Sequence, residues 1–211
     1  MIHIAIVDDH HIVAEGFARL INMQSGMTIT SILNSYDDTV KYLTNVTPDV
    51  MLVDISLPER SGIELMNYIH EHFPDIKLIT LSMYDTEPYI SDAFKAGACG
   101  YLSKRVASDE LILAIERILE GKHYLSDDVA VNRLKNQKIN DELNLTAREI
   151  EVFKLLAGSI SIKRIAKILQ MQPKTVHAHK ANLSKKLNIQ SSEEIRKTAL
   201  QYNLISLEDL K

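Results

Sequence analysis

Five short apolar segments alternate with amphipathic helical segments over the first 120 residues, and this alternation constrains the fold more than any other feature. The strands are expected at 2–7, 27–33, 49–54, 76–81 and 99–102. Between them, apolar residues recur at helical spacing. In the first helix, the residues expected on the buried face are Ile12, Val13, Phe17, Leu20 and Ile21. The pattern predicts an α/β fold with a doubly wound, five-stranded parallel sheet, because strands without polar alternation are buried on both faces.

Charge divides the chain into two parts. The formal net charge of the 211 residues is −4. Residues 1–120 carry 8 basic and 18 acidic side chains, a net charge of −10, whereas residues 143–211 carry 12 and 6, a net charge of +6. Residues 121–142 hold 4 of each sign; 127–136 could form one helix, but 135–142 is polar and has no apolar stripe. We therefore predict an acidic domain at 1–120, a linker at 121–142 and a basic domain at 143–211, whose charge suits nucleic acid.

The composition also indicates in which cellular compartment the protein is expected. The chain has one cysteine, Cys99, which excludes an internal disulfide framework and a cysteine zinc cluster. Its apolar runs are too short to span a membrane, and its first residues lack the basic start of a signal peptide. We expect a cytoplasmic protein with no membrane partner.

The basic part has helical periodicity throughout, which predicts an all-α domain of four helices. Thr146 and Glu149 have the spacing of a capping box at the start of the first helix. The other three helices are expected at 161–169, 173–187 and 191–202. The short break before Pro173, which suits a first helical turn, gives the second and third helices the pattern of a helix-turn-helix.

Acidic residues follow two of the expected strands. Asp8 and Asp9 come directly after the first strand, and Asp54 ends the third. The carboxyl ends of parallel strands meet at one edge of the sheet, so the three carboxylates are expected to converge. Converging carboxylates repel one another unless a hard cation binds, and oxygen ligands suit Mg²⁺. Ser82 and Lys104 follow neighbouring strands and complete a set that suits phosphoryl transfer to a carboxylate.

Each of these residues also has a structural interpretation. Asp8 and Asp9 could cap the first helix, and Lys104 could be a solvated loop residue. Their joint occurrence at the strand ends favours the functional interpretation.

The same stretches, at 7–10, 53–58, 81–82 and 100–104, are similar to the signature of the receiver domain of response regulators. The resemblance covers about residues 1–120 and implies that Asp54 is the phosphoacceptor. It implies that Asp9, Asp54 and the carbonyl group of Ser56 hold Mg²⁺, with Asp8 acting through a bound water. It also implies three residues that bind the phosphoryl group or switch with it, Ser82, Lys104 and Tyr101. Tyr101 would turn inward as Ser82 moves; the alternative is a surface aromatic packed on a helix.

The helix expected at 173–187 has two different faces. The apolar face holds Val176, His179, Leu183 and Leu187. The opposite face holds Lys174, His177, Ala178, Ala181 and Lys185. Small residues let a helix enter a groove closely, a histidine can hydrogen-bond base edges, and lysines can bind phosphates. The alternative is a solvated basic face.

Stretches at 145–149, 165–166, 174–179 and 186–189 resemble the LuxR/NarL-type DNA-binding domain. This resemblance covers about residues 143–205. It implies base-facing positions at His177, Ala178 and Ala181. It implies phosphate contacts at Lys163, Thr175, Lys180 and Lys185, and a dimerisation helix at 191–202.

One departure from that family pattern concerns Arg164. The family usually has a glutamate there, paired with the arginine that matches Arg148. Two cations at these positions should repel each other. Either Glu149 or Glu151 compensates, or Arg164 turns outward to a phosphate.

The two resemblances together predict a two-component transcription regulator that is not an enzyme. A sensor histidine kinase would phosphorylate Asp54, and the protein would then form a homodimer, bind promoter DNA and act on RNA polymerase. Within the family, the stretches at 54–58, 61–65, 100–105 and 173–179 are most similar to regulators of hexose-phosphate uptake.

Two other functions stay open. One is a transcription factor that is switched by a ligand or a partner without phosphate. The other is a phosphatase with an aspartyl nucleophile, which usually has a second acid where this chain has Ser56.

Overall fold

The computed structural model describes residues 1–105, 108–169, 171–202 and 204–205. The chain divides into two compact units, with the division between Asn132 and Arg133. Among the helices in these described ranges, none combines the length and apolar character that a membrane crossing requires.

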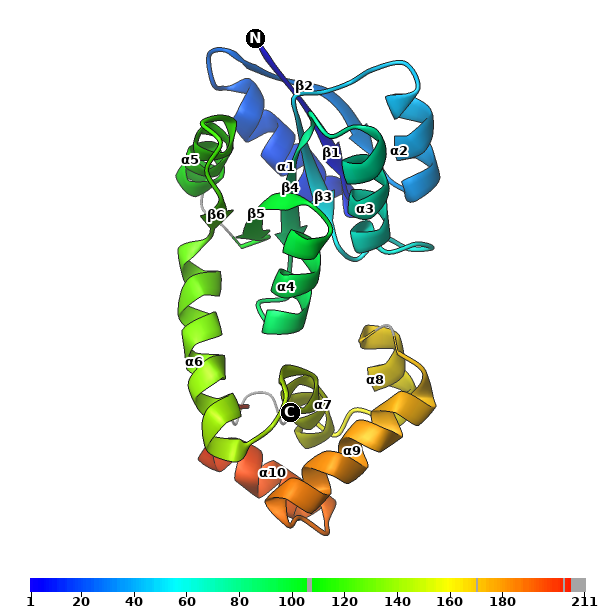
Figure 1. The fold of residues 1–211 in the computed structure, drawn as a ribbon, viewed down its shortest axis with the longest axis vertical. Coiled ribbons are helices and arrows are strands. Elements are labelled where there is room, and N and C mark those ends of the chain that lie inside the picture. Colours follow the sequence, from blue (N-terminus) through cyan, green and yellow to red (C-terminus); the bar gives the residue numbers. More distant parts are fainter. Residues whose placement is uncertain (106–107, 170, 203, 206–211) are drawn as a thin grey trace. The chain divides into compact units, whose positions relative to one another are not determined.

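The first unit alternates strands and helices along the chain (Figure 1). Its strands are β1 (Ile2–Val7), β2 (Met27–Leu33), β3 (Val50–Asp54), β4 (Lys77–Ser82), β5 (Ala98–Ser103) and β6 (Tyr124–Leu125). Its helices are α1 (His11–Asn22), α2 (Tyr36–Leu43), α3 (Gly62–His72), α4 (Glu87–Lys95) and α5 (Ser108–Leu119). All neighbouring strands are parallel, in the order β2-β1-β3-β4-β5-β6. The predicted doubly wound sheet is confirmed.

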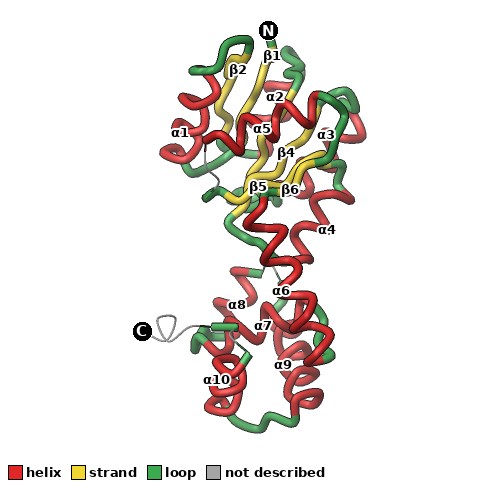
Figure 2. Tube along the Cα trace, turned by 90° about the vertical axis from the view of Figure 1, so that its left-hand side faces the viewer, coloured by secondary structure: helices red, strands yellow, loops and turns green. Residues whose placement is uncertain are grey.

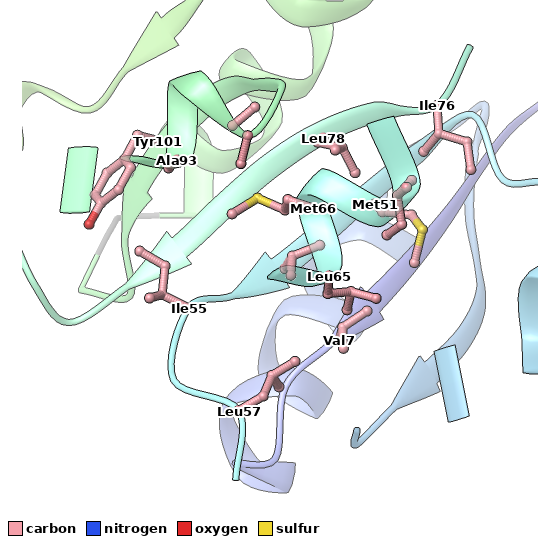
Figure 3. Close-up of a cluster of buried hydrophobic side chains, with 14 of the residues drawn as sticks. Val7, Met51, Ile55, Leu57, Leu65, Met66, Ile76, Leu78, Ala93 and Tyr101 are labelled. Carbon is pink, nitrogen blue, oxygen red and sulfur yellow. The ribbon is translucent and has the colours of Figure 1, made fainter. Parts of the chain in front are cut away.

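Two apolar cores sandwich this sheet. One contains Phe17 and Ile21 of α1 and Ile115 of α5, packed on one face of the strands. The other contains Leu43, Met66 and Ile90, so that α2, α3 and α4 cover the opposite face. Figure 2 shows helices on both sides of the strands, and Figure 3 shows part of the second core. The continuous apolar character of β1 and β3 follows from this burial on both faces.

Ile12 was expected on the buried face of α1, and this prediction is wrong: its side chain is 89% exposed. The buried stripe consists of Ala14, Phe17, Ala18 and Ile21. At 3.6 residues per turn, Ile12 lies about 170° away from the centre of that stripe. The two alanines define the buried face because small side chains let the helix approach the sheet closely.

The region predicted as a linker, 121–142, contains secondary structure. β6 adds a sixth, two-residue strand beside β5, and helix α6 runs without interruption from Asp127 to Leu143. Val129 of α6 is fully buried in the core of the first unit. The sequence signal was weak, because a two-residue strand has no period and α6 has no continuous apolar stripe.

The second unit contains α7 (Ala147–Ala157), α8 (Ile162–Ile168), α9 (Pro173–Leu187) and α10 (Ser192–Gln201). The four predicted helices are confirmed. Thr146 and Ser191 each form a capping box with the glutamate three residues later. Helix α9 packs against α7 and α8, and α10 packs against α7. The shared core includes Phe153, Ile165 and Val176.

Candidate functional site

The register of the sheet brings the acidic residues together. Val7 of β1 pairs with Val53 of β3, so the residues that follow them, Asp8 and Asp54, lie side by side at the carboxyl ends of the strands. β1 lies between β2 and β3, which is where the strand order reverses. Ligands of open α/β sheets bind at this position.

Lys104 reaches across the end of the sheet to both carboxylates. Its Nζ lies 2.7 Å from Oδ2 of Asp8 and 2.8 Å from Oδ2 of Asp54. The side chains are 4%, 0% and 1% exposed, respectively, so the three charges are almost fully removed from water. The backbone N–H of Lys104 donates to the carbonyl oxygen of Ser82 at 2.8 Å, which anchors the lysine beside β4. The lysine is therefore part of the site and not a solvated loop residue.

The site holds more negative than positive charge. Burial raises the pKa of Asp54 above its ordinary value, while the hydrogen bond and charge of Lys104 and the N–H of Ser56 offset only part of this effect. Asp8 adds to the rise by repulsion. Asp9, whose side chain is 32% exposed, lies at the rim. Three carboxylates with one ammonium group fit a divalent cation, and their oxygen atoms are ligands that Mg²⁺ accepts.

The loop after β3 is held closely against Asp54. The N–H of Ser56 donates to Oδ1 of Asp54 at 3.1 Å, and the N–H of Gly62 donates to the carbonyl oxygen of Ile55 at 2.9 Å. A Cβ atom on Gly62 would overlap the carbonyl group of Asp54. A glycine at the start of α3 therefore permits the close packing that positions Asp54.

His10 belongs to this cluster, although no role was predicted for it from the sequence. Its Nδ1 lies 2.9 Å from Oδ1 of Asp9 and 3.2 Å from Oδ1 of Asp8. Asp8, Asp9, His10 and Asp54 each offer a ligand atom, and these atoms all lie within 4.8 Å of one another. The signal in the sequence was its position directly after the two aspartates.

Ser82 and Tyr101 are connected through Tyr84. The hydroxyl group of Ser82 accepts a hydrogen bond from the N–H of Tyr84 at 2.9 Å, and the hydroxyl group of Tyr101 donates to the carbonyl oxygen of Tyr84 at 2.8 Å. Tyr101 is fully buried at one end of the core shown in Figure 3, so it is not a surface aromatic. The ring of Tyr84 stacks on Tyr89 of α4, with centroids 4.4 Å apart. Tyr84 had no motif that would have identified it.

The start of α6 is attached to the same elements. The N–H of Ser126 donates to the carbonyl oxygen of Tyr101 at 3.1 Å, and its hydroxyl group accepts from the N–H of Ser103 at 3.3 Å. Asn132 donates through Nδ2 to Oδ2 of Asp85, in the loop between β4 and α4, at 2.8 Å. Ser126 and the first turns of α6 therefore contact β5, which carries Tyr101, and the loop that follows Ser82.

The second unit presents the expected residues on α9. Val176 and Leu183 are fully buried, and His179 is half-buried. The exposed residues include the five that were expected opposite the apolar face, Lys174, His177, Ala178, Ala181 and Lys185. Lys163 on α8 is also exposed, whereas Thr175 and Lys180 are half-buried. The two faces of α9 are thus as predicted.

In the polar network around Arg148, Glu151 takes the place of the glutamate that the family usually has at position 164. Arg148 pairs with Glu151 at 2.9 Å, and Glu149 pairs with Lys186 at the end of α9 at 2.7 Å. Arg164 is exposed on α8. Burial raises the pKa of Glu149, but hydrogen bonds from Lys186 and Thr146 outweigh it and hold the pKa below its ordinary value. Glu149 therefore joins the start of α7 to the end of the helix that carries the basic face.

Comparison with known protein families identifies both units. Residues 4–116 match the model of the response regulator receiver domain, and residues 135–199 match that of bacterial regulatory proteins of the luxR family. The matches cover the acidic site with its flanking strands and the four helices of the second unit.

Relatives extend over almost the whole chain. This chain is 34% identical over 214 residues to the oxygen regulatory protein NreC of Staphylococcus epidermidis, and the alignment covers 96% of this chain and 98% of NreC. It is 35% identical over 195 residues to the transcriptional regulatory protein UhpA of Escherichia coli K12, covering 92% and 96%. A crystal structure of a LuxR-family two-component response regulator from Aurantimonas sp. SI85-9A1 covers 65% of this chain and 97% of its own, with 31% identity and a TM-score of 0.60.

NreC and UhpA are regulatory proteins, and each aligns with more than nine tenths of this chain, across both units. The chain therefore belongs to the family of two-component response regulators that join a receiver domain to a LuxR-type DNA-binding domain.

Proposed function

We propose that Asp54 accepts a phosphoryl group from a sensor histidine kinase. The observation that carries this proposal is the single ammonium group of Lys104 placed between Oδ2 of Asp8 and Oδ2 of Asp54. In the transfer, an Asp54 oxygen forms a bond to phosphorus while the bond from phosphorus to the donor imidazole breaks, and the electron pair stays with the imidazole. Lys104 then faces the new phosphoryl oxygens.

Asp9, Asp54 and the carbonyl group of Ser56 would hold the metal, with Asp8 contributing through a water molecule. A bound Mg²⁺ would neutralise charge on the phosphoryl oxygens. The excess of carboxylates over cations supports this role. Buried Asp8 would orient the Lys104 ammonium group between itself and Asp54.

The hydroxyl group of Ser82 would bind a phosphoryl oxygen and exchange its contact with the N–H of Tyr84. Because Tyr101 donates to the carbonyl group of the same residue, a shift of Tyr84 would change the position of the Tyr101 ring. The contacts of Ser126 with Tyr101 and of Asn132 with Asp85 would carry the change to the start of α6.

In the second unit, α9 would enter the major groove of promoter DNA. His177, Ala178 and Ala181 would face the bases, while Lys163, Lys174, Thr175, Lys180 and Lys185 would contact phosphates. The exposed small residues support close approach of the helix, and the exposed lysines supply the charge. Helix α10 would mediate a homodimer on activation, and RNA polymerase in the cytoplasm would be the final partner.

Phosphorylation of the full-length protein by acetyl phosphate in the presence of Mg²⁺ tests the acceptor, with the added mass measured on intact protein. Asp54→Asn should abolish the added mass of one phosphoryl group. The control Asp75→Asn changes an exposed aspartate after α3 and should be labelled normally. Undiminished labelling of Asp54→Asn would refute the assignment.

A further inference from the structure

The ring of His10 is directed at the carboxylates and not at the helix that it precedes. His10 is the N-cap residue of α1, but its side chain makes no capping hydrogen bond. Its backbone N–H donates to Oδ1 of Asp8 at 2.9 Å, which fixes the residue beside the site. The ring itself contacts Oδ1 of Asp8 through Nδ1 at 3.2 Å, and its side chain is 60% exposed.

The distances around Nδ1 of His10 include a hydrogen bond to Asp8, and they also match the spacing of ligands that share one ion. Neighbouring ligands on an octahedral ion with bonds of about 2.1 Å lie about 3 Å apart, and opposite ligands lie about 4.2 Å apart. Nδ1 lies 2.9 Å from Oδ1 of Asp9, 3.2 Å from Oδ1 of Asp8 and 3.9 Å from Oδ2 of Asp54. Only small rearrangements would place Nδ1 of His10, Oδ1 of Asp9 and Oδ2 of Asp54 around one cation, with Oδ1 of Asp8 facing the ion through a water molecule. Oδ2 of Asp54 would then be shared with Lys104, which contacts it at 2.8 Å.

Lys104 does not compete for this position on Asp8. It contacts Oδ2 of Asp8, whereas the ring of His10 contacts Oδ1. Lys104 and His10 thus contact different oxygens of the same buried carboxylate. A metal ion on the Oδ1 side of Asp8 would leave the contact between Lys104 and Asp8 intact.

An imidazole nitrogen changes the preference of an oxygen site. Mg²⁺ strongly prefers oxygen ligands, whereas the later divalent ions of the first transition series, such as Co²⁺, Ni²⁺ and Zn²⁺, bind imidazole well. We propose that His10 is an additional metal ligand and that it raises the preference of this site for such an ion over Mg²⁺. The proposal rests on the metal site assigned above to Asp9 and Asp54.

Calorimetric titration of the full-length protein with CoCl₂ and, separately, with MgCl₂ tests this role. In His10→Ala the affinity for Co²⁺ should fall about tenfold or more, because even residues that only orient ligands contribute that much. The affinity for Mg²⁺ should change less than about threefold, since the imidazole is a poor ligand for that ion. The ligand-field absorption of bound Co²⁺ should shift as a nitrogen donor is lost.

Two variants serve as controls. His11→Ala removes the neighbouring exposed histidine, which is not in the cluster, and should leave both affinities unchanged. His10→Phe keeps the volume of a ring without a donor atom and should repeat the loss in His10→Ala; it also replaces that variant if the alanine disturbs folding.

Equal losses for both ions, or no loss for Co²⁺, in the His10 variants would overturn the proposal. Asp54→Asn separates it from the proposed function. If Asp54→Asn weakens both ions while the His10 variants weaken neither, the assigned metal site stands and only the role of His10 fails. If Asp54→Asn leaves both affinities unchanged, the assigned metal site itself is wrong.

Discussion

The receiver and the DNA-binding domain both bury acidic residues, but they compensate the charge in opposite ways. In the receiver, Asp8 and Asp54 share one lysine, and the pKa of Asp54 is raised by burial that Lys104 only partly offsets. In the DNA-binding domain, burial also acts to raise the pKa of Glu149, but Lys186 and the capping box of α7 outweigh it, and the pKa is lowered. A buried carboxylate whose negative charge is only partly compensated is typical of a ligand-binding site. A buried carboxylate whose charge is fully compensated stabilises the packing of helices.

The largest effect should come from removing the shared cation. Lys104→Met leaves two buried carboxylates without their counter-ion and should lower the free energy of unfolding of the receiver by about 3–5 kcal/mol. Urea unfolding followed by tyrosine fluorescence measures this, because seven of the eight tyrosines lie in the first unit. Lys95→Met changes an exposed lysine of α4 and should have little effect. A loss below about 1 kcal/mol for Lys104→Met would contradict the proposed compensation.

A smaller effect is expected from the pair in the DNA-binding domain. Glu149→Gln removes a charge-assisted hydrogen bond to Lys186 and should cost this domain about 1.5–3 kcal/mol, measured by circular dichroism during urea unfolding. Glu193→Gln, at an exposed position in α10, is the control. If the effects of Glu149→Gln and Lys186→Met simply add in the double variant, the two side chains are not coupled.

The same pair predicts a dependence on pH. Because the folded state lowers the pKa of Glu149, its contribution to stability is fully present above the unfolded value, near the ordinary 4.5. It is lost as the pH falls through the lower pKa of the folded state. The difference in unfolding free energy between the wild type and Glu149→Gln should therefore shrink below pH 4.5. A constant difference across this range would show that the charge of Glu149 is not the cause.

Asp54→Asn should change the free energy of unfolding in the opposite direction, and by a smaller amount. The raised pKa of Asp54 means that its charged form costs stability above that pKa, so removing the charge should raise the unfolding free energy at neutral pH. The gain should fade as the pH drops through the raised pKa, where the wild-type carboxyl group becomes protonated. A loss of stability at pH 7 in metal-free buffer would mean that Lys104 already compensates Asp54 fully.

The smallest effect on stability per substitution is expected for the exposed lysines of α8 and α9, which should instead change DNA affinity. If Lys163 and Lys185 contact phosphates, each Lys→Ala should weaken binding to all DNA sequences and reduce the slope of log affinity against log salt by about one. Lys197→Ala, on exposed α10, should leave the slope unchanged. A change in sequence preference without a change in slope would instead place the lysine on a base. These exposed charges should not alter the unfolding free energy by more than about 0.5 kcal/mol.

Local patterns were sufficient for most of the fold and for the candidate acidic site. The strands β1 and β2 begin and end where their apolar runs do, and the capping box of Thr146 and Glu149 was readable from a spacing of three. Such features depend on neighbours within one turn or one strand. The buried face of α1 was partly misassigned because Ile12 has the right hydrophobicity but lies on the side away from Ala14 and Ala18.

Contacts between distant residues could not be read in the same way. Lys186 and Glu149 are 37 positions apart, and only the packing of α9 against α7 brings them to 2.7 Å. Tyr84 connects Ser82 to Tyr101 through its backbone N–H and carbonyl groups. Because nearly every residue carries these groups, the residue type at position 84 does not predict this role. The two residues of β6 gain their pairing from β5 and have no period of their own.

The sequence by itself determined that this chain has a parallel α/β sheet with carboxylates at its carboxyl edge, followed by a basic helical domain, because periodic burial and strand-end position are local properties. Only the tertiary structure decided which oxygen of Asp8 meets Lys104 and which meets His10, and which acid pairs with Arg148. Strand register, helix packing and rotamer choice select these partners, and each depends on chain segments far apart in sequence.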